Sequence, residues 1–184
     1  LALFLIGGAT SLWSEYQPNP TLNNPAVEQT APLEGKETRF GTTGTVLWSV
    51  TTTAASNGSV NGMQDSLSPL SGMVALVNMM VGEVIFGGVG AGMYGMLLNV
   101  LIAVFLAGLM IGRTPEYLGK KLQAKEVQLL VVTLLVMPVG VLVLSAIAAS
   151  LPGPAGAISN PGPHGFSQLL YAYTSASANN GSAF

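Results

Sequence analysis

The sequence predicts an all-α integral membrane protein, built from spanning helices and from short half-helices that enter the membrane without crossing it. Charged residues make up 8% of the 184 residues, against roughly 25% in soluble domains. Two stretches are apolar and long enough to cross a bilayer as helices, and neither alternates as barrel strands do. A short half-helix pattern ending in Asn-Gly-Ser occurs twice.

Residues 1–13 are predicted to be the end of a truncated spanning helix. The run from Leu1 to Trp13 is apolar, begins without Met, and lacks the basic region and cleavage signature of a secretory signal. Residues 14–40 are predicted to form an extracytoplasmic loop, because four prolines rule out a long regular helix there. These prolines are Pro18, Pro20, Pro25 and Pro32.

Residues 41–70 are predicted to hold the first half-helix, acting as a pore helix, and the filter loop that follows it. The moderately apolar, Thr-rich stretch from Gly41 to Ala55 would give a helix of roughly 22 Å at 1.5 Å per residue, which is too short to cross comfortably. We therefore expect a re-entrant half-helix, followed by Ser56-Asn57-Gly58-Ser59.

Residues 71–112 are predicted to form a broken spanning helix. They hold one charge, Glu83, and Gly87, Gly88 and Gly90 interrupt the run with residues of poor helix propensity. Irregular backbone is tolerated at membrane depth only inside protein or beside a water-filled cavity. These four residues are therefore candidates for an ion pathway or gate. The alternatives are close helix packing through glycine and a structural carboxylate satisfied by neighbouring backbone.

Residues 113–126 are predicted to form a cytoplasmic basic loop, because they hold four of the six Lys and Arg residues directly after a spanning segment. Thr114-Pro115-Glu116 fits a helix start, so we expect a short interfacial helix there. Arg113 is a candidate barrier or partner contact, with snorkelling to lipid headgroups as the alternative. Residues 127–151 follow as a spanning helix that Pro138 is expected to kink.

Residues 152–184 are predicted to repeat the arrangement of residues 41–70. A Pro and Gly loop from Pro152 to Gly165 precedes a second half-helix, Phe166 to Ala178, and a second Asn-Gly-Ser loop. Counting crossings from the basic loop places both half-helices on the extracytoplasmic side. Pore elements that act together must enter from one side, and this parity follows from charge and length alone.

The two loops are the candidate ion-binding site. Rings of backbone carbonyls can replace the hydration shell of a monovalent cation, and glycine adopts the backbone geometry that such rings need. Neither loop contains Asp or Glu, which calcium sites use. The alternative is that Asn-Gly is an ordinary turn. The predicted ligands are the backbone carbonyls of Ser56, Asn57, Gly58, Asn179, Asn180 and Gly181.

Motifs for catalysis are missing from the sequence. It has no Walker A motif, phosphorylated Asp motif, GxSxG elbow or HExxH helix, so we predict no nucleotide bound by this chain. The single histidine, His164, is expected to serve loop structure. An intramembrane hydrolase using Ser59 or Ser182 with His164 is a third reading, and the missing nucleophile context counts against it.

Several long motifs point to a known family. They are Glu34-Gly35-Lys36-Glu37 with Arg39-Phe40-Gly41, and the stretches Thr52 to Gly58, Gly82 to Gly90, Gly112 to Lys121, Asn160 to Ser167 and Asn179 to Phe184. Together they closely resemble the potassium-transporting ATPase A subunit of the bacterial Kdp system, from about Glu34 to the end. One departure is Asn57, where some members carry Cys, so an affinity is not transferred from relatives.

The resemblance implies the superfamily of K⁺ transporters, with four units of outer helix, pore loop and inner helix, of which this chain would hold the third and fourth pore loops. It implies K⁺ as the transported ion and a multi-pass location in the bacterial plasma (inner) membrane. The implied partners are a P-type ATPase catalytic subunit, which hydrolyses ATP, and a small single-span C subunit. The alternative is a channel-like K⁺ permease gated by a cytoplasmic nucleotide-binding ring.

Overall fold

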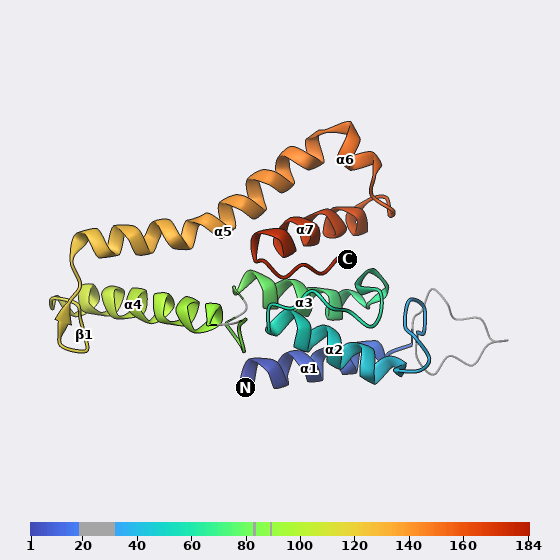
Figure 1. Ribbon diagram of the computed structural model, residues 1–184, viewed down its shortest axis with the longest axis horizontal. Coiled ribbons are helices and arrows are strands. Elements are labelled where there is room, and N and C mark those ends of the chain that lie inside the picture. Colours follow the sequence, from blue (N-terminus) through green and yellow to red (C-terminus); the bar gives the residue numbers. More distant parts are fainter. Residues whose placement is uncertain (19–31, 83, 89) are drawn as a thin grey trace.

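The computed structural model describes residues 1–18, 32–82, 84–88 and 90–184. These residues fold into helices, apart from one two-stranded hairpin and the connecting loops. A bundle of short helices forms one part of the molecule, and two long helices extend from it side by side (Figure 1). The predicted all-α class is therefore confirmed.

The bundle consists of α1 (Ala2–Glu15), α2 (Gly41–Ala54), α3 (Pro69–Met80) and α7 (Pro163–Ser177). The long helices are α4 (Ala91–Ile111) and α5 (Ala124–Ser150). Short elements join them: the 3₁₀ turn η2 (Gln64–Ser66), the strands β1 (Glu116–Tyr117) and β2 (Lys120–Lys121), and α6 (Pro152–Gly156).

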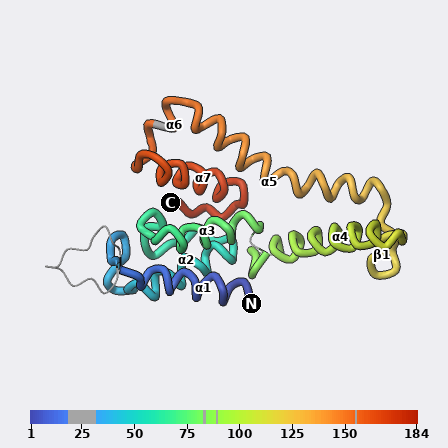
Figure 2. Tube along the Cα trace, turned by 180° about the vertical axis from the view of Figure 1, so that it is seen from behind, coloured from blue at the N-terminus to red at the C-terminus, as the bar shows by residue number. Residues whose placement is uncertain are grey.

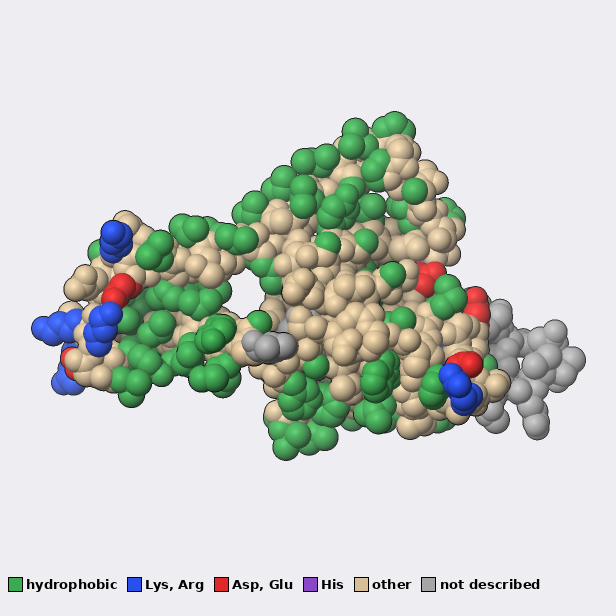
Figure 3. All heavy atoms as spheres, in the orientation of Figure 1, with side chains coloured by type: hydrophobic (Ala, Val, Ile, Leu, Met, Phe, Trp, Pro, Cys, Tyr) green, Lys and Arg blue, Asp and Glu red, His purple; other side chains and the backbone are tan. Residues whose placement is uncertain are grey.

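The two long helices, α4 and α5, meet the length and hydropathy that a membrane crossing needs. Apolar side chains cover their surface, and basic side chains gather at their far end beside the hairpin (Figure 3). Almost none of α4 and little of α5 is buried in the protein. Apolar helices left this exposed are unfavourable in water but suit contact with lipid.

The predicted interfacial helix after Thr114-Pro115-Glu116 is wrong. This segment forms the antiparallel hairpin of β1 and β2 instead. Leu118 and Gly119 occupy its turn with φ of 49° and 79°, the two positive values that a tight hairpin turn requires and that glycine favours. The next helix, α5, begins later, where Gln123 and Glu126 form a capping box.

The predicted Pro and Gly loop from residue 152 to 165 is partly helical. It contains α6, and α7 begins at Pro163, where the fixed φ of proline suits the first helical position. Gly165 therefore lies in the first turn of α7 rather than in a loop. A Cβ built on it would lie 1.9 Å from the Asn160 carbonyl oxygen, so this turn packs tightly.

The predicted interruption of the 71–112 segment is present. Helix α3 ends at Met80 and α4 begins at Ala91. Between them Gly82, Gly87 and Gly90 have positive φ, which ends one helix and redirects the chain into the next. Helix α5, in contrast, continues through Pro138, and its ribbon bends along its length (Figure 1).

Helix α3 holds the bundle together because it is buried on two sides. One side packs against α1 and α2 through a cluster built on Val46, Val50 and Val74. The other side packs against α7 through Ala75, Met79 and Tyr171. Both ribbon views place α3 between these layers, with the C-terminal segment lying between α3 and α7 (Figures 1 and 2). This packing brings together the C-terminal ends of α2 and α7.

Candidate ion-binding site

Both half-helices end in the same backbone turn. After α2 the amide of Asn57 donates a hydrogen bond of 3.1 Å to the carbonyl of Thr52. After α7 the amide of Asn180 donates one of 2.9 Å to the carbonyl of Ser175. Laying Gly181 on Gly58 superposes these two bonds residue for residue, so the repeat in the sequence is also a repeat in structure.

The residue after each half-helix turn lies in the left-handed region of the backbone. Ser56 has a φ of 54° and Asn179 a φ of 62°. Residues other than glycine rarely adopt this conformation, and such residues cluster at functional sites. The helix ends here, and the next residues run as a loop without helix or strand.

Hydroxyl groups from the half-helices hold the two loops in place. The hydroxyl of Thr52 donates a 2.8 Å bond to the Ser59 carbonyl, and the hydroxyl of Ser175 donates a 2.7 Å bond to the Ser182 carbonyl. The Thr52 hydroxyl also contacts the Asn57 carbonyl oxygen. Each half-helix thus uses one hydroxyl near its end to anchor the loop that follows it.

Asparagine side chains stiffen each loop further. The Oδ1 atom of Asn57 accepts the amide of Ser59 at 2.8 Å, and Oδ1 of Asn180 accepts the amide of Ser182 at 3.1 Å. Such Asx turns bond a side chain to the backbone two residues on. Asn57 therefore shapes its loop, a role that a Cys at this position could fill only weakly.

The two loops meet each other directly. The side-chain amide of Asn180 donates to the Thr52 carbonyl at 3.2 Å, which ties the loop after α7 to the end of α2. A Cβ built on Gly58 would lie 2.9 Å from the carbonyl oxygen of Asn180 and from the carbonyl carbon of Gly181. Residues from distant parts of the sequence thus form one site, as the repeat predicts.

The two glycines are needed for different reasons. Gly181 has a φ of 89°, and a Cβ on it would meet only the Cα of Gly58 at 3.8 Å. Gly58 does not have positive φ but has no room for a side chain. We expected both glycines to be needed for their backbone freedom. For Gly58 this is wrong, because glycine is needed there to let the backbone of the opposite loop come close.

The glycine break lies against the end of α2 and the loop that follows it. The amides of Phe86 and Gly87 donate to the Ala54 carbonyl at 3.2 and 3.3 Å, which caps the end of α2. A Cβ on Gly88 would lie 3.2 Å from the Cβ of Ser56. The candidate pathway residues Gly87 and Gly88 are thus brought beside the filter loop.

The remaining pathway candidates lie elsewhere. Gly90 begins α4 with a φ of 86°. Arg113 is exposed and comes two residues after α4 ends. That end of α4 points away from the helix bundle (Figure 1). Glu83 lies outside the residues that the structure describes, so its role stays a prediction from sequence.

The electrostatics of the site favour a cation without offering a full negative charge. The C-terminal ends of α2 and α7 both lead into the loops, and a helix C-terminus carries a partial negative charge of about half an electron. The donors supplied are carbonyl and amide oxygens. Among the described residues there is no cluster of three or more His, Asp or Glu side chains that would hold a metal ion. This donor set fits a weakly hydrated monovalent cation.

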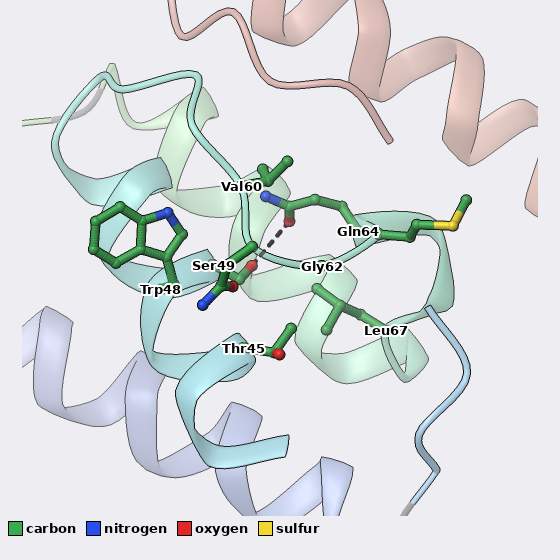
Figure 4. Close-up of a pocket in the computed structure, with 9 residues that line it drawn as sticks. Thr45, Trp48, Ser49, Val60, Gly62, Gln64 and Leu67 are labelled. Carbon is green, nitrogen blue, oxygen red and sulfur yellow. Dashed lines mark hydrogen bonds between the residues drawn. The ribbon is translucent and has the colours of Figure 1, made fainter. Parts of the chain in front are cut away.

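A narrow crevice lies between α2 and the segment that follows it (Figure 4). The hydroxyl of Ser49 donates to Oε1 of Gln64 at 2.8 Å across it. The indole of Trp48 donates to the Ser59 carbonyl at 3.1 Å. The crevice has no room for a water molecule, so we interpret it as packing that supports the loop after α2 rather than as a ligand site.

Two features of the site were missed from the sequence. His164 is not a loop residue but lies in α7, with Nε2 2.5 Å from Oδ1 of Asp65. Glu15 and Lys36 form an ion pair of 3.1 Å that is wholly buried. Nothing in the sequence marks residues so far apart as partners. The Ser182 hydroxyl bonds Tyr171 at 2.8 Å and His164 faces Asp65, which argues against a hydrolytic Ser-His pair here.

Comparison with known proteins places the chain in a family. The family model described as the potassium-transporting ATPase A subunit matches residues 1–184. The potassium-transporting ATPase potassium-binding subunit of Pseudomonas fluorescens strain SBW25 is 97% identical over 184 residues. The proteins of the same name from P. fluorescens strain Pf0-1 and Pseudomonas syringae pv. tomato strain DC3000 are 91% and 89% identical.

Each match covers 100% of this chain and 33% of the relative, so the chain spans about a third of the length of these relatives. The chain belongs to the KdpA family of potassium-transporting ATPase A subunits.

Proposed function

We propose that this chain supplies two filter loops of a subunit that binds and translocates K⁺ in an ATP-driven, high-affinity uptake complex. The observation that carries the proposal is the direct meeting of two Asn-Gly-Ser loops at Gly58 and Gly181, where a side chain on Gly58 would clash with the backbone of the opposite loop. The relatives are named potassium-binding subunits, which supports K⁺ as the ion.

The loops would select K⁺ by replacing its hydration shell with backbone carbonyls held at fixed positions. Fixed positions come from the matching anchors at Thr52 and Ser175. The proposed ligands are the carbonyls of Ser56, Asn57, Gly58, Asn179, Asn180 and Gly181. The Asn57 carbonyl also contacts the Thr52 hydroxyl, whose single proton serves either the Asn57 or the Ser59 carbonyl. A carbonyl has two lone pairs, so at least one on Asn57 is left for the ion. The remaining carbonyls around the ion would come from the rest of the subunit.

The energy for uptake would come from a partner. The relatives' name assigns them to a potassium-transporting ATPase, so a P-type catalytic subunit would hydrolyse ATP, assisted by a small single-span C subunit. We place the chain in the bacterial inner membrane as a multi-pass protein, with both half-helices entering from outside. Glu83 and the glycine break would border the ion path, and exposed Arg113 would meet the partner or the lipid headgroups. The permease reading shares these loops, but the relatives' name favours the ATPase.

The test replaces Gly58 and Gly181 by Ser, one at a time, in the full-length subunit assembled in its complex. We expect the K⁺ concentration for half-maximal ATPase stimulation to rise before the maximal rate falls, and discrimination against rubidium and ammonium to weaken. The reason is that a distorted carbonyl ring binds K⁺ less tightly but still passes ions.

The control is Gly153→Ser in α6, because a Cβ there meets no atom within 4 Å and its φ is not positive. Gly165 is unsuitable as such a control, because a Cβ on it would clash with the Asn160 carbonyl. Wild-type affinity and ion preference in both filter variants would reduce the Asn-Gly-Ser loops to ordinary turns and remove the basis of the proposal.

A further inference from the structure

A polar cluster joins the two repeats away from the filter loops themselves. Asp65 lies in η2, shortly after the third-repeat filter loop, and its side chain is 17% exposed. Its Oδ1 atom lies 2.5 Å from Nε2 of His164, and its Oδ2 atom accepts the side-chain amide of Asn160 at 2.8 Å. Both carboxylate oxygens of Asp65, in the third repeat, therefore contact residues of the fourth repeat.

The segment that carries Asp65 is itself fixed. On its other side the ammonium of Lys36 donates to the Ser66 carbonyl at 3.0 Å, and a carboxylate oxygen of Glu15 accepts the Ser68 amide at 2.5 Å. Lys36 and Glu15 also pair with each other. These are the other ionisable groups that contact this segment among the described residues, and they neutralise one another. Asp65 is thus a fixed point against which the fourth repeat is held.

His164 connects Asp65 to the fourth filter loop. It lies in the first turn of α7, and the same helix ends at the turn that begins the loop. Its ring centroid also lies 6.0 Å from that of Phe184, which follows the loop and packs 4.6 Å from the Tyr171 ring. A shift of His164 would therefore move both ends of the fourth loop. The close contact at Gly58 leaves almost no room for such a movement.

We propose that Asp65 is a positioning residue that acts through His164 and Asn160 to set the spacing of the third and fourth filter loops, and so sets K⁺ affinity. The inference rests on the proposed function of those loops. It assigns the residues a role distinct from ligation, because they lie outside both filter loops, and distinct from general stability, because their bonds run between repeats rather than within one.

The experiment uses the full-length subunit in its complex and measures K⁺-stimulated ATPase together with equilibrium K⁺ binding. Asp65→Ala should raise the half-saturating K⁺ concentration roughly five- to tenfold, in the lower range of measured coupling between sites, and change the maximal rate less than about twofold. Asp65→Asn and His164→Gln, which keep hydrogen-bonding groups, should retain most of the affinity. The double variant Asp65→Ala with His164→Ala should be no worse than either single one, since residues acting as a unit are not additive.

The matched control is Glu37→Ala. Glu37 is also a paired carboxylate, but its partner Arg39 is two residues away, and both side chains are largely exposed, so the affinity should not change. Should Asp65→Ala prevent assembly, His164→Ala gives the same test, because that side chain is 46% exposed. Wild-type affinity in the assembled Asp65→Ala or His164→Ala variant, together with lost affinity in Gly58→Ser, overturns this inference and leaves the proposed function standing. Wild-type affinity in Gly58→Ser and Gly181→Ser as well overturns both.

Discussion

At the scale of single residues, the same amino acid meets two different physical demands in the two loops. Gly181 is required by its backbone angle, and Gly58 is required by the approach of the opposite loop. The sequence shows both glycines in the same motif, so the loops could be predicted but the difference could not. It depends on where the second loop lies, which no local pattern records.

Substitution by asparagine can separate the need for positive φ from the need for space. It tolerates positive φ better than other residues with a side chain, and position 181 has room for a Cβ. Gly181→Asn should therefore raise the half-saturating K⁺ concentration less than Gly181→Val does. At Gly58, Asn and Val should be similarly damaging, because the clash is with backbone.

The measurement is K⁺ binding by the four purified variants in the assembled complex. If Asn were no better than Val at position 181, backbone strain would not be the reason for that glycine.

At the scale of elements, helices were predictable where composition and length decide them. The half-helices, the interruption and the long helix over residues 124–150 lie close to where the sequence places them, with ends shifted by a few residues. The hairpin was missed because Thr114-Pro115-Glu116 has the residue types of a helix start. Leu118 and Gly119 adopt positive φ only a few residues later, and this turn forms a hairpin instead of a helix.

The glycine break offers a test of how one element supports another. Gly88→Ala places a Cβ 3.2 Å from the Cβ of Ser56, a contact closer than most side chains allow. We expect the break to shift from the third loop, and K⁺ affinity to fall severalfold with assembly retained. The reason is that the amides that cap Ala54 move with it.

Titration of ATPase activity with K⁺ checks the expected loss at Gly88. Gly8→Ala in α1 is the control, because a Cβ there meets nothing within 4 Å. Equal affinity in the two variants would mean that the break is ordinary helix packing.

At the scale of the whole molecule, what the sequence could not show are the contacts between distant segments. It predicted that two loops would act together, but not that Asp65 and His164 join their repeats or that Glu15 pairs with Lys36. Single charges in loops are usually solvated, and pairing over such separations follows from the packing of α1, α3 and α7 around the loops. The buried ion pair of Glu15 and Lys36 is a contact on which stability is expected to depend strongly.

Lys36→Met should destabilise the protein strongly. The ion pair of Lys36 and Glu15 is wholly buried, and it joins the end of α1 to the segment between the third filter loop and α3. Removing one partner leaves an uncompensated buried charge, which costs about 3–5 kcal/mol, whereas replacing both partners by apolar groups of similar volume is often neutral. The double variant Glu15→Leu with Lys36→Met should therefore recover much of the stability lost in the single one.

Thermal unfolding of the purified complex measures this difference, with Arg39→Met as the control for loss of an exposed pair. Exposed pairs contribute only about 0–1 kcal/mol, so the control should unfold close to the wild type. Recovery in the double variant would show that the cost lies in the unpaired carboxylate. A double variant as unstable as Lys36→Met would instead show that the bonds to this segment matter more than the unpaired charge. The Lys36 bond to Ser66 is lost in both variants, and the Glu15 bond to Ser68 is lost in the double variant alone.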